Sequence, residues 1–216
     1  MMKNDFDPIA WFLERIFRYH NKCNILLWKY PIRLMCFIKG VRIGRKVNFN
    51  GFPVIRRYEN SKIIIGDNCT FNSARNSVRV GLHDRCTLVT LLKGSEIVFG
   101  NNSGGSGIMV LAATKIIVGN NVLIGSHTMI IDNDFHHSDP SKRHENENIP
   151  ARPIIIEDNV FIGTNCMILK GITIGKNSVI GANSVVITSI PENSIAIGNP
   201  CKIIIKKSWD TPKVKN

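Results

Sequence analysis

Three of the six histidines in this 216-residue chain stand close together, at His136, His137 and His144. Asp134 and Asp139 lie beside them. Neutral imidazole near pH 7 can take a proton from a hydroxyl group, which is the role of a general base. A carboxylate or carbonyl bonded to the other ring nitrogen would fix its tautomer. The segment is therefore a candidate site for deprotonating an alcohol, although a solvated polar loop with incidental histidines would have the same composition.

A metal centre is the competing interpretation, because histidine and aspartate are common metal ligands. Their spacing does not match the helix-borne His-Glu-x-x-His pattern or another strong zinc pattern. The six cysteines are scattered without a Cys-x-x-Cys pair, which argues against zinc and thioredoxin-type redox sites. We therefore predict no metal site, and reduced cysteines are typical of a cytoplasmic protein.

The polar stretch 132–153 interrupts a regular repeat, which must position it. After the stretch, an aliphatic residue recurs at every sixth position, and a small or β-branched residue follows four positions after each one. A period of six is neither the 3.6 of a helix nor the alternation of a plain strand. It predicts an all-β parallel solenoid in which three units make one triangular coil, with the aliphatic side chains in the bore. These residues are Ile156, Ile162, Ile168, Ile174, Ile180 and Val186.

Glycine follows several of these aliphatic residues directly, as at Gly163, Gly175 and Gly181. We expect glycine to allow a tight or left-handed backbone at the corner of the coil.

The repeats extend over residues 41–205, which we interpret as one solenoid domain with the loop 132–153. An interruption of this length is more often a functional loop than a structural need. Between 71 and 107 the pattern is less regular. The run 101–107 is too polar and flexible for a core strand, and is either a plain turn or a polar wall of a sugar site.

Residues 1–40 form a separate, mostly helical segment. Asp7 followed by Pro8 is typical of a helix start. We expect Pro31 to start or kink a second helical piece. Two interpretations stay open: a helical cap packed on the first coil, or an interfacial helix over 8–39, rich in basic and aromatic residues, that rests on a membrane.

The net charge of +12 is concentrated towards the ends of the chain. Residues 1–50 hold ten Lys or Arg against three acids, and 206–216 form a basic tail. Clustered positive charge favours phosphates, anionic membranes or nucleic acid. We disfavour nucleic acid, because aromatic–basic interleaving and a recognised binding module are missing. The first residues do not resemble a signal peptide, and no stretch reaches the roughly 18 apolar residues of a membrane span.

Several motifs occur together in order: the loop pattern Asp-x-Asp-Phe-His-x-x-Asp-Pro-x-x-Arg (132–143), Asn-Val-Phe-Ile-Gly (159–163), Gly-Ala-Asn-Ser-Val-Val (181–186) and Ile-Gly-Asn-Pro-Cys-Lys-Ile-Ile (197–204). With the repeats, they make the chain resemble the left-handed β-helix acyltransferases, in particular the sugar O-acetyltransferase branch. The resemblance is close over about 96–205 and looser over 41–95. It implies a left-handed coil and a homotrimer with active sites between subunits.

The resemblance also implies acetyl coenzyme A as acyl donor and His136 as the catalytic base. This histidine would deprotonate a sugar hydroxyl, which attacks the thioester carbonyl directly while a backbone N–H binds the oxyanion. Candidate supporting residues are Asp134, Asp139, His137 and Phe161. Coenzyme A would lie on the coils after the loop, with backbone N–H groups on its pantetheine and a lysine on a phosphate, at Thr164, Gly181, Ala182 and Lys202.

Two departures from the family pattern bear on cofactor affinity and acceptor choice. Phe161 stands where many relatives carry tryptophan, and Ile187-Thr188 where many carry Thr-Lys. The expected function is acetyl-CoA-dependent O-acetylation of a sugar hydroxyl in synthesis of a cell-surface polysaccharide, in the cytoplasm at the inner face of the membrane. The alternatives are N-acetylation of an amino (nucleotide) sugar and a non-catalytic solenoid that binds glycans or membranes.

Overall fold

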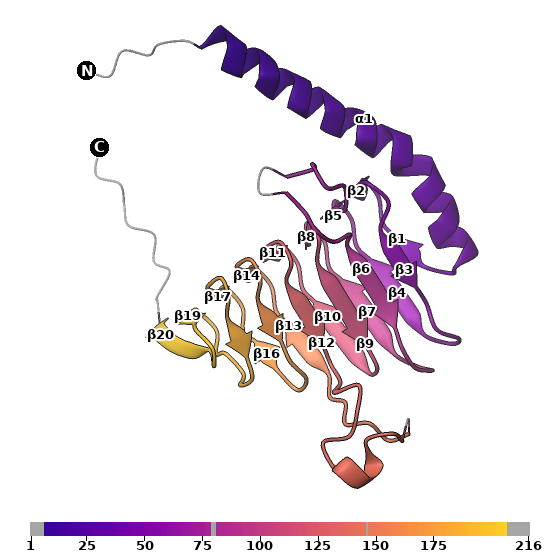
Figure 1. Ribbon diagram of the computed structural model, residues 1–216, viewed down its shortest axis with the longest axis vertical. Coiled ribbons are helices and arrows are strands. Elements are labelled where there is room, and N and C mark those ends of the chain that lie inside the picture. Colours follow the sequence, from indigo (N-terminus) through magenta and orange to yellow (C-terminus); the bar gives the residue numbers. More distant parts are fainter. Residues whose placement is uncertain (1–6, 79–80, 146, 207–216) are drawn as a thin grey trace.

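The computed structural model describes residues 7–78, 81–145 and 147–206, and it shows a parallel β-solenoid with one long helix at its N-terminal end (Figure 1). The described strands form three sheets, here called A, B and C, with six, eight and six strands. Each full turn of the chain adds one strand to A, then one to B, then one to C. The basic tail predicted over 206–216 lies, apart from Lys206, outside the described residues, as do residues 1–6.

Sheet A contains β1 (Arg42–Ile43), β4 (Lys62–Ile65), β7 (Glu96–Phe99), β10 (Lys115–Val118), β13 (Ile154–Ile156) and β16 (Thr173–Ile174). Sheet B contains β2 (Asn48–Asn50), β5 (Thr70–Asn72), β8 (Gly104–Ser106), β11 (Leu123–Ile124), β14 (Phe161–Ile162), β17 (Val179–Ile180), β19 (Ser194–Ile197) and β20 (Lys202–Lys206). Sheet C contains β3 (Val54–Arg56), β6 (Thr87–Thr90), β9 (Met109–Ala112), β12 (Met129–Ile131), β15 (Met167–Ile168) and β18 (Val185–Val186).

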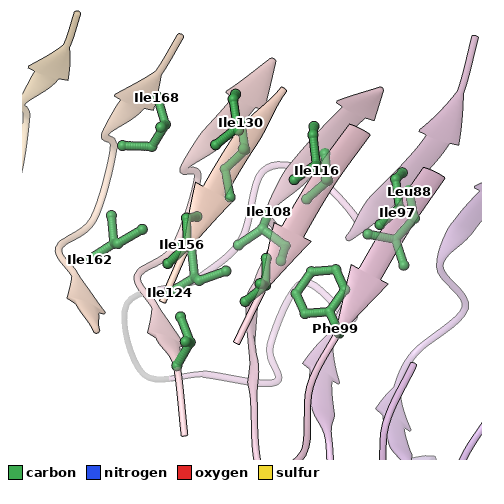
Figure 2. Packing of buried hydrophobic residues seen from close by; sticks show 14 of the residues in the cluster. Leu88, Ile97, Phe99, Ile108, Ile116, Ile124, Ile130, Ile156, Ile162 and Ile168 are labelled. Carbon is green, nitrogen blue, oxygen red and sulfur yellow. The ribbon is translucent and has the colours of Figure 1, made fainter. Parts of the chain in front are cut away.

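The six-residue repeat determines which strands stack. Ile156 pairs with Ile174 on sheet A, and Ile162 pairs with Ile180 on sheet B, so one coil is eighteen residues long here, as predicted. The aliphatic side chains of the repeats point into the bore and are almost fully buried (Figure 2). Cutting one such isoleucine back to alanine typically costs about 2–5 kcal/mol. The bore is therefore the main source of stability.

Of the tight or left-handed backbone that we expected at Gly163, Gly175 and Gly181, the left-handed form is not found. Asparagines take it instead: φ is 60° at Asn159 and 58° at Asn177. Gly163 is needed for another reason, because an added Cβ would lie 2.5 Å from the backbone nitrogen of Ala182 in the next coil. Glycine thus allows close stacking, while asparagine tolerates the positive φ at the corner.

The prediction that residues 101–107 contain no core strand is wrong, because β8 (Gly104–Ser106) lies within sheet B. Gly105 occupies the bore position next to Phe71, with which it pairs. The rings of Phe71 and Phe99 pack edge to face at 5.2 Å and are buried. An added Cβ at Gly105 would lie 2.7 Å from Ile108 Cγ2. Ile108 and Ile124 thus fill the bore where β8 has glycine.

The helix α1 (Pro8–Ile38) packs on the first coil by its C-terminal part, which confirms a helical cap. Ile32 and Cys36 are fully buried, and the ring of Trp28 meets Phe52 at 5.4 Å. Pro31 does not start a second helix, since α1 continues through it. No helix among the described residues is both long and apolar enough to cross a membrane.

Candidate functional site

The loop that carries the histidines leaves the solenoid after β12 and returns at β13, at the corner between sheets C and A (Figure 1). Asp132 at its base is fully buried. Its carboxylate accepts hydrogen bonds from the N–H groups of Ala113 and Thr114 at 2.6 and 2.7 Å, and from the Thr114 hydroxyl at 2.8 Å. Asn133 forms an antiparallel bridge with Ala151. This neck fixes the direction in which the loop leaves the coil.

Beyond the neck, the backbone turns at Phe135, which has a φ of 60°. Its N–H donates to Asn133 Oδ1 at 2.9 Å, and the N–H of His136 donates to the carbonyl oxygen of Asp134 at 2.7 Å. A left-handed φ at a bulky residue costs about 1–3 kcal/mol and persists only where the surroundings enforce it. The turn leaves His136 exposed, which suits a base that must meet a substrate outside its own coil.

His137 braces the same loop. Its Nε2 lies 2.7 Å from the carbonyl oxygen of Glu147. Because a carbonyl only accepts, this nitrogen is the donor, and the bond ties the two arms of the loop together. Of the two adjacent histidines, His136 is therefore the better candidate for proton transfer.

The two predicted supporting carboxylates help to shape the loop. Asp134 forms a close ion pair with the ammonium group of Lys170. Asp139 caps the short 3-10 helix η1 (Pro140–Lys142) by accepting bonds from the N–H and the hydroxyl of Ser141 at 2.9 and 2.8 Å. Both bonds lower the pKa of the Asp139 carboxyl, and the bond from the hydroxyl has the larger effect.

Lys170 is a site residue that the sequence pattern did not single out. It lies in the turn between β15 and β16, and its side chain is 24% exposed. Counting coils could have found it, since the corner that releases the loop recurs one coil later at Lys170. Asp132 stood inside the recognised loop pattern, but its anchoring role follows only from its burial and its partners.

The predicted coenzyme residues Thr164 and Ala182 lie one coil apart at the corner between sheets B and C. The N–H of Asn183 donates to the Thr164 carbonyl at 2.9 Å, and the Thr164 hydroxyl donates to the carbonyl of Ser126 in the preceding coil at 2.7 Å. Both Thr164 and Ala182 are exposed. Within the described parts of the chain, their backbone N–H groups have no hydrogen-bond acceptor. Two stacked backbone donors are thus open to a ligand.

The remaining predicted residues lie near the same corner. Gly181 precedes Ala182, and an added Cβ there would lie 2.4 Å from Ile197 Cγ2, so coil stacking requires glycine. Lys202 begins β20 opposite Ile197 and is exposed. Phe161 lies in β14 on sheet B with 44% of its surface exposed, three residues before Thr164.

Within the described chain, the predicted base and the predicted coenzyme residues are placed on different corners of the solenoid. The loop of His136 leaves one edge of sheet C, and Thr164 stands at the opposite edge. The coil between Thr164 and Lys170 spans roughly 15–20 Å at the rise of an extended chain. The two halves of the candidate site stand on different corners of the coil.

Coils of three short parallel strands, a six-residue repeat and a histidine loop at one corner together define the left-handed β-helix class. The comparisons with known proteins agree. A family model described as the hexapeptide repeat of succinyl-transferase matches residues 153–189 and 172–203. Galactoside O-acetyltransferase of Lactococcus lactis is 41% identical over 90 residues, which cover 42% of this chain and 42% of that protein.

Solved structures extend the likeness over most of the chain. A hexapeptide-repeat acetyltransferase of Vibrio cholerae, also solved with acetyl coenzyme A, has a TM-score of 0.53 at 25% identity, covering 89% of this chain and 87% of that one. An N-acyltransferase of Bacillus cereus, solved with dTDP and coenzyme A, has a TM-score of 0.60 at 19% identity over 82% and 89% of the two chains, and shows the fold alone.

The chain carries the hexapeptide repeat over residues 153–203 and is similar to hexapeptide-repeat acetyltransferases. It spans only 33–57% of the length of the first curated relatives that it matches.

Proposed function

We propose that this protein transfers an acetyl group from acetyl coenzyme A to a hydroxyl group of a sugar, at a site that a second copy of the chain completes. The observation that carries the proposal is the placement of His136, exposed on a braced turn at one corner of the coil. The open amide donors of Thr164 and Ala182 at another corner support it. A general base and preformed N–H donors are what acyl transfer to an alcohol requires.

The reaction is a direct transfer. His136 takes the proton of the sugar hydroxyl while the oxygen attacks the thioester carbonyl carbon. The carbonyl oxygen becomes an oxyanion, which a backbone N–H stabilises. The intermediate collapses by breaking the carbon–sulfur bond, and the imidazolium returns its proton to the departing thiolate. The products are the acetyl ester and free coenzyme A.

In this proposal, different residues bind different parts of the long acyl donor. The amide N–H groups of Thr164 and Ala182 bond the pantetheine carbonyls, and Lys202 pairs with a phosphate. The Vibrio and Bacillus relatives, solved with acetyl coenzyme A and with coenzyme A, support this donor. Gly163 supports the arrangement, because it allows the coils carrying the two amides to stack closely.

The distance between the corners favours a site shared between copies. A loop at the C–A corner can meet a coenzyme bound at the B–C corner when neighbouring subunits lie side by side. A closed threefold assembly would build three equal sites in this way. We infer a homotrimer in the cytoplasm, where the free cysteines of the structure remain reduced.

The acceptor in this proposal is a sugar of a cell-surface polysaccharide. The Lactococcus relative, named for a galactoside hydroxyl, supports a sugar alcohol. An amino sugar is the second candidate, since the Bacillus protein of the same fold is an N-acyltransferase. An amine would need the same base, so products must distinguish the two.

The experiment is release of free thiol from acetyl coenzyme A over a panel of sugars, nucleotide sugars, amino sugars and oligosaccharides. We expect turnover with a hydroxyl acceptor and a loss of roughly 10²–10⁴-fold in kcat for His136→Ala. His144→Ala, an exposed histidine of the same loop, is the matched control and should keep its activity. Products formed only from amines would replace O-acetylation by N-acetylation. Failure to bind acetyl coenzyme A would leave a non-catalytic solenoid.

A further inference from the structure

The helix α1 presents an apolar face to solvent. Its side chains include some of the most exposed large hydrophobic residues of the described chain, at 81% for Phe37, 71% for Tyr19 and 64% for Leu27. With Phe12, Ile16 and Leu34 they fall within an arc of about 80° on a helix of 3.6 residues per turn. A continuous exposed patch of this kind marks an interaction surface.

The opposite face of α1 is already in use. Ile32 and Cys36 are buried on the first coil, and Asn21 donates from Nδ2 to the carbonyl of Ser77 at 3.2 Å. Figure 1 shows α1 running from the first coil out beyond the strands, with its N-terminal half away from the sheets. The orientation of the helix is therefore fixed by its inner face, and the coils of its own chain cannot cover the outer one.

A cationic edge runs beside the apolar face. Arg15, Arg18, Lys22 and Lys29 fall within a second arc of about 60° on the same helical wheel. Glu14 is the only acid from Pro8 to Ile38, and it pairs with Arg18 at 3.1 Å. Three of these cations, together with Ile16 and Tyr19, line a surface hollow of about 460 Å³. The hollow offers positive charge and apolar walls to a phosphate group.

We propose that α1 lies in the plane of an anionic membrane, with its apolar face among the acyl chains and its cationic edge on the lipid phosphates. The helix of 31 residues would extend about 46 Å along the surface. Wide amphipathic helices with basic edges and aromatic residues bind membranes in this orientation. A second copy fits less well, because another α1 has only one acid, Glu14, and so offers few anionic partners to the cationic edge.

The inference does not rest on the proposed enzymatic activity. Where that activity also holds, the membrane in question is the inner face of the cell membrane, and acceptor glycans on that surface would be concentrated near the enzyme.

The test is flotation of the full chain with two kinds of vesicle, phosphatidylcholine alone and phosphatidylcholine mixed with phosphatidylglycerol. No acyl donor is present. We expect binding to the mixed vesicles that salt weakens. The double variant Arg15→Glu/Lys22→Glu should lower partitioning at least about tenfold. Leu27→Ser/Phe37→Ser should lower it by a similar factor, because it removes the buried apolar area.

Matched controls come from the turn between β6 and β7. Leu92→Ser and Lys93→Glu make the same changes at exposed positions of the solenoid and should leave partitioning unchanged. Circular dichroism should show unchanged helix content in all variants. Equal binding to both vesicles would overturn the charge part of the proposal. Absence of vesicle binding would overturn the whole, and self-association lost in Leu27→Ser/Phe37→Ser would assign the face to a second copy.

Discussion

The two corners that flank sheet C are built in different ways. At the B–C corner, Ser126, Thr164 and Ala182 stand at equivalent places in successive coils, and mainly backbone bonds hold them, such as Asn183 N–H to the Thr164 carbonyl. The result is a line of donors repeated at the spacing of the coils. Such a line suits a long, extended ligand.

The C–A corner has no such regularity at the loop. Side chains hold it, with Asp132 on the amides of Ala113 and Thr114 and with Asp134 on Lys170. This corner presents one reactive side chain, His136, in one direction. Under the proposed function, the repeated corner binds the coenzyme and the single interruption supplies the base.

The largest expected effect tests whether the two corners act across copies. His136→Ala removes the base, and Ala182→Trp blocks the donor line with a bulky side chain at an exposed position. Each variant alone should lose at least about 100-fold in kcat/KM. Coexpression of the two should restore about a quarter of wild-type activity, because random assembly reunites intact corners at some boundaries.

If coexpression of the two variants restores no activity, both corners of each site belong to the same chain. A mixture of His136→Ala with itself, prepared in the same way, is the control for assembly.

The next effect compares the anchors of the two corners. Asp132→Ala leaves two backbone N–H groups and a hydroxyl unpaired in a buried position, so we expect a loss of about 2–4 kcal/mol in the free energy of unfolding. Thr164→Ala, at the backbone-held corner, should cost under about 1 kcal/mol. Urea unfolding measures both. Equal costs would remove the distinction between a corner held by side chains and one held by the backbone.

A smaller effect separates the roles of two lysines. Lys170→Met frees Asp134 and lets the loop shift, which should lower kcat about tenfold with little change in KM for acetyl coenzyme A. Lys170→Arg should restore most of the rate. Lys202→Met should do the reverse, raising KM for acetyl coenzyme A about tenfold while kcat stays near its wild-type value. Steady-state kinetics with both substrates varied decides, and a KM effect from Lys170→Met would move that residue to the coenzyme side.

The smallest effect concerns the tip of the loop. The pKa of Asp139 lies below its ordinary value of 3.8, because Ser141 donates to the charged carboxylate. The cap of η1 is therefore fully formed above that ordinary value and is lost as the pH falls through the lower pKa of the folded protein. An NMR titration of the Ser141 amide should show its midpoint below 3.8. In Ser141→Ala the Asp139 carboxyl should titrate closer to its ordinary value.

Much of the fold could be predicted because the sequence repeat directly determines which side chains stack on one another in the bore. Ile162 and Ile180 stand at a fixed sequence separation, and their pairing follows from it. The strand at Gly104–Ser106 escaped prediction because the space at its bore position is filled by Ile108 and Ile124 and not by a side chain of its own. Local composition cannot show which neighbour fills a space.

The site was predictable in the same uneven way. His136 and Thr164 stand in ordered motifs, so a resemblance could single them out. Lys170 meets Asp134 because the chain returns to the same corner after the loop, so only a count of coils across the loop, and not the local sequence pattern, could have linked them. The face that α1 turns outward likewise followed only from the contacts of its inner face.

The last residues of the described chain bear on whether the stack of strands can continue into another molecule. A stack of parallel strands ends in unpaired backbone groups that could recruit another chain. Here backbone hydrogen bonds pair the last coil with later residues. Ile190 bonds to Thr173 of β16, and Val185 of β18 bonds to Gly198 and Cys201. On sheet B, β19 pairs with β17. The antiparallel β20 then closes the rim of sheet B. Continuation of the parallel stack is thereby disfavoured on sheet B, because its edge strand runs in the opposite direction.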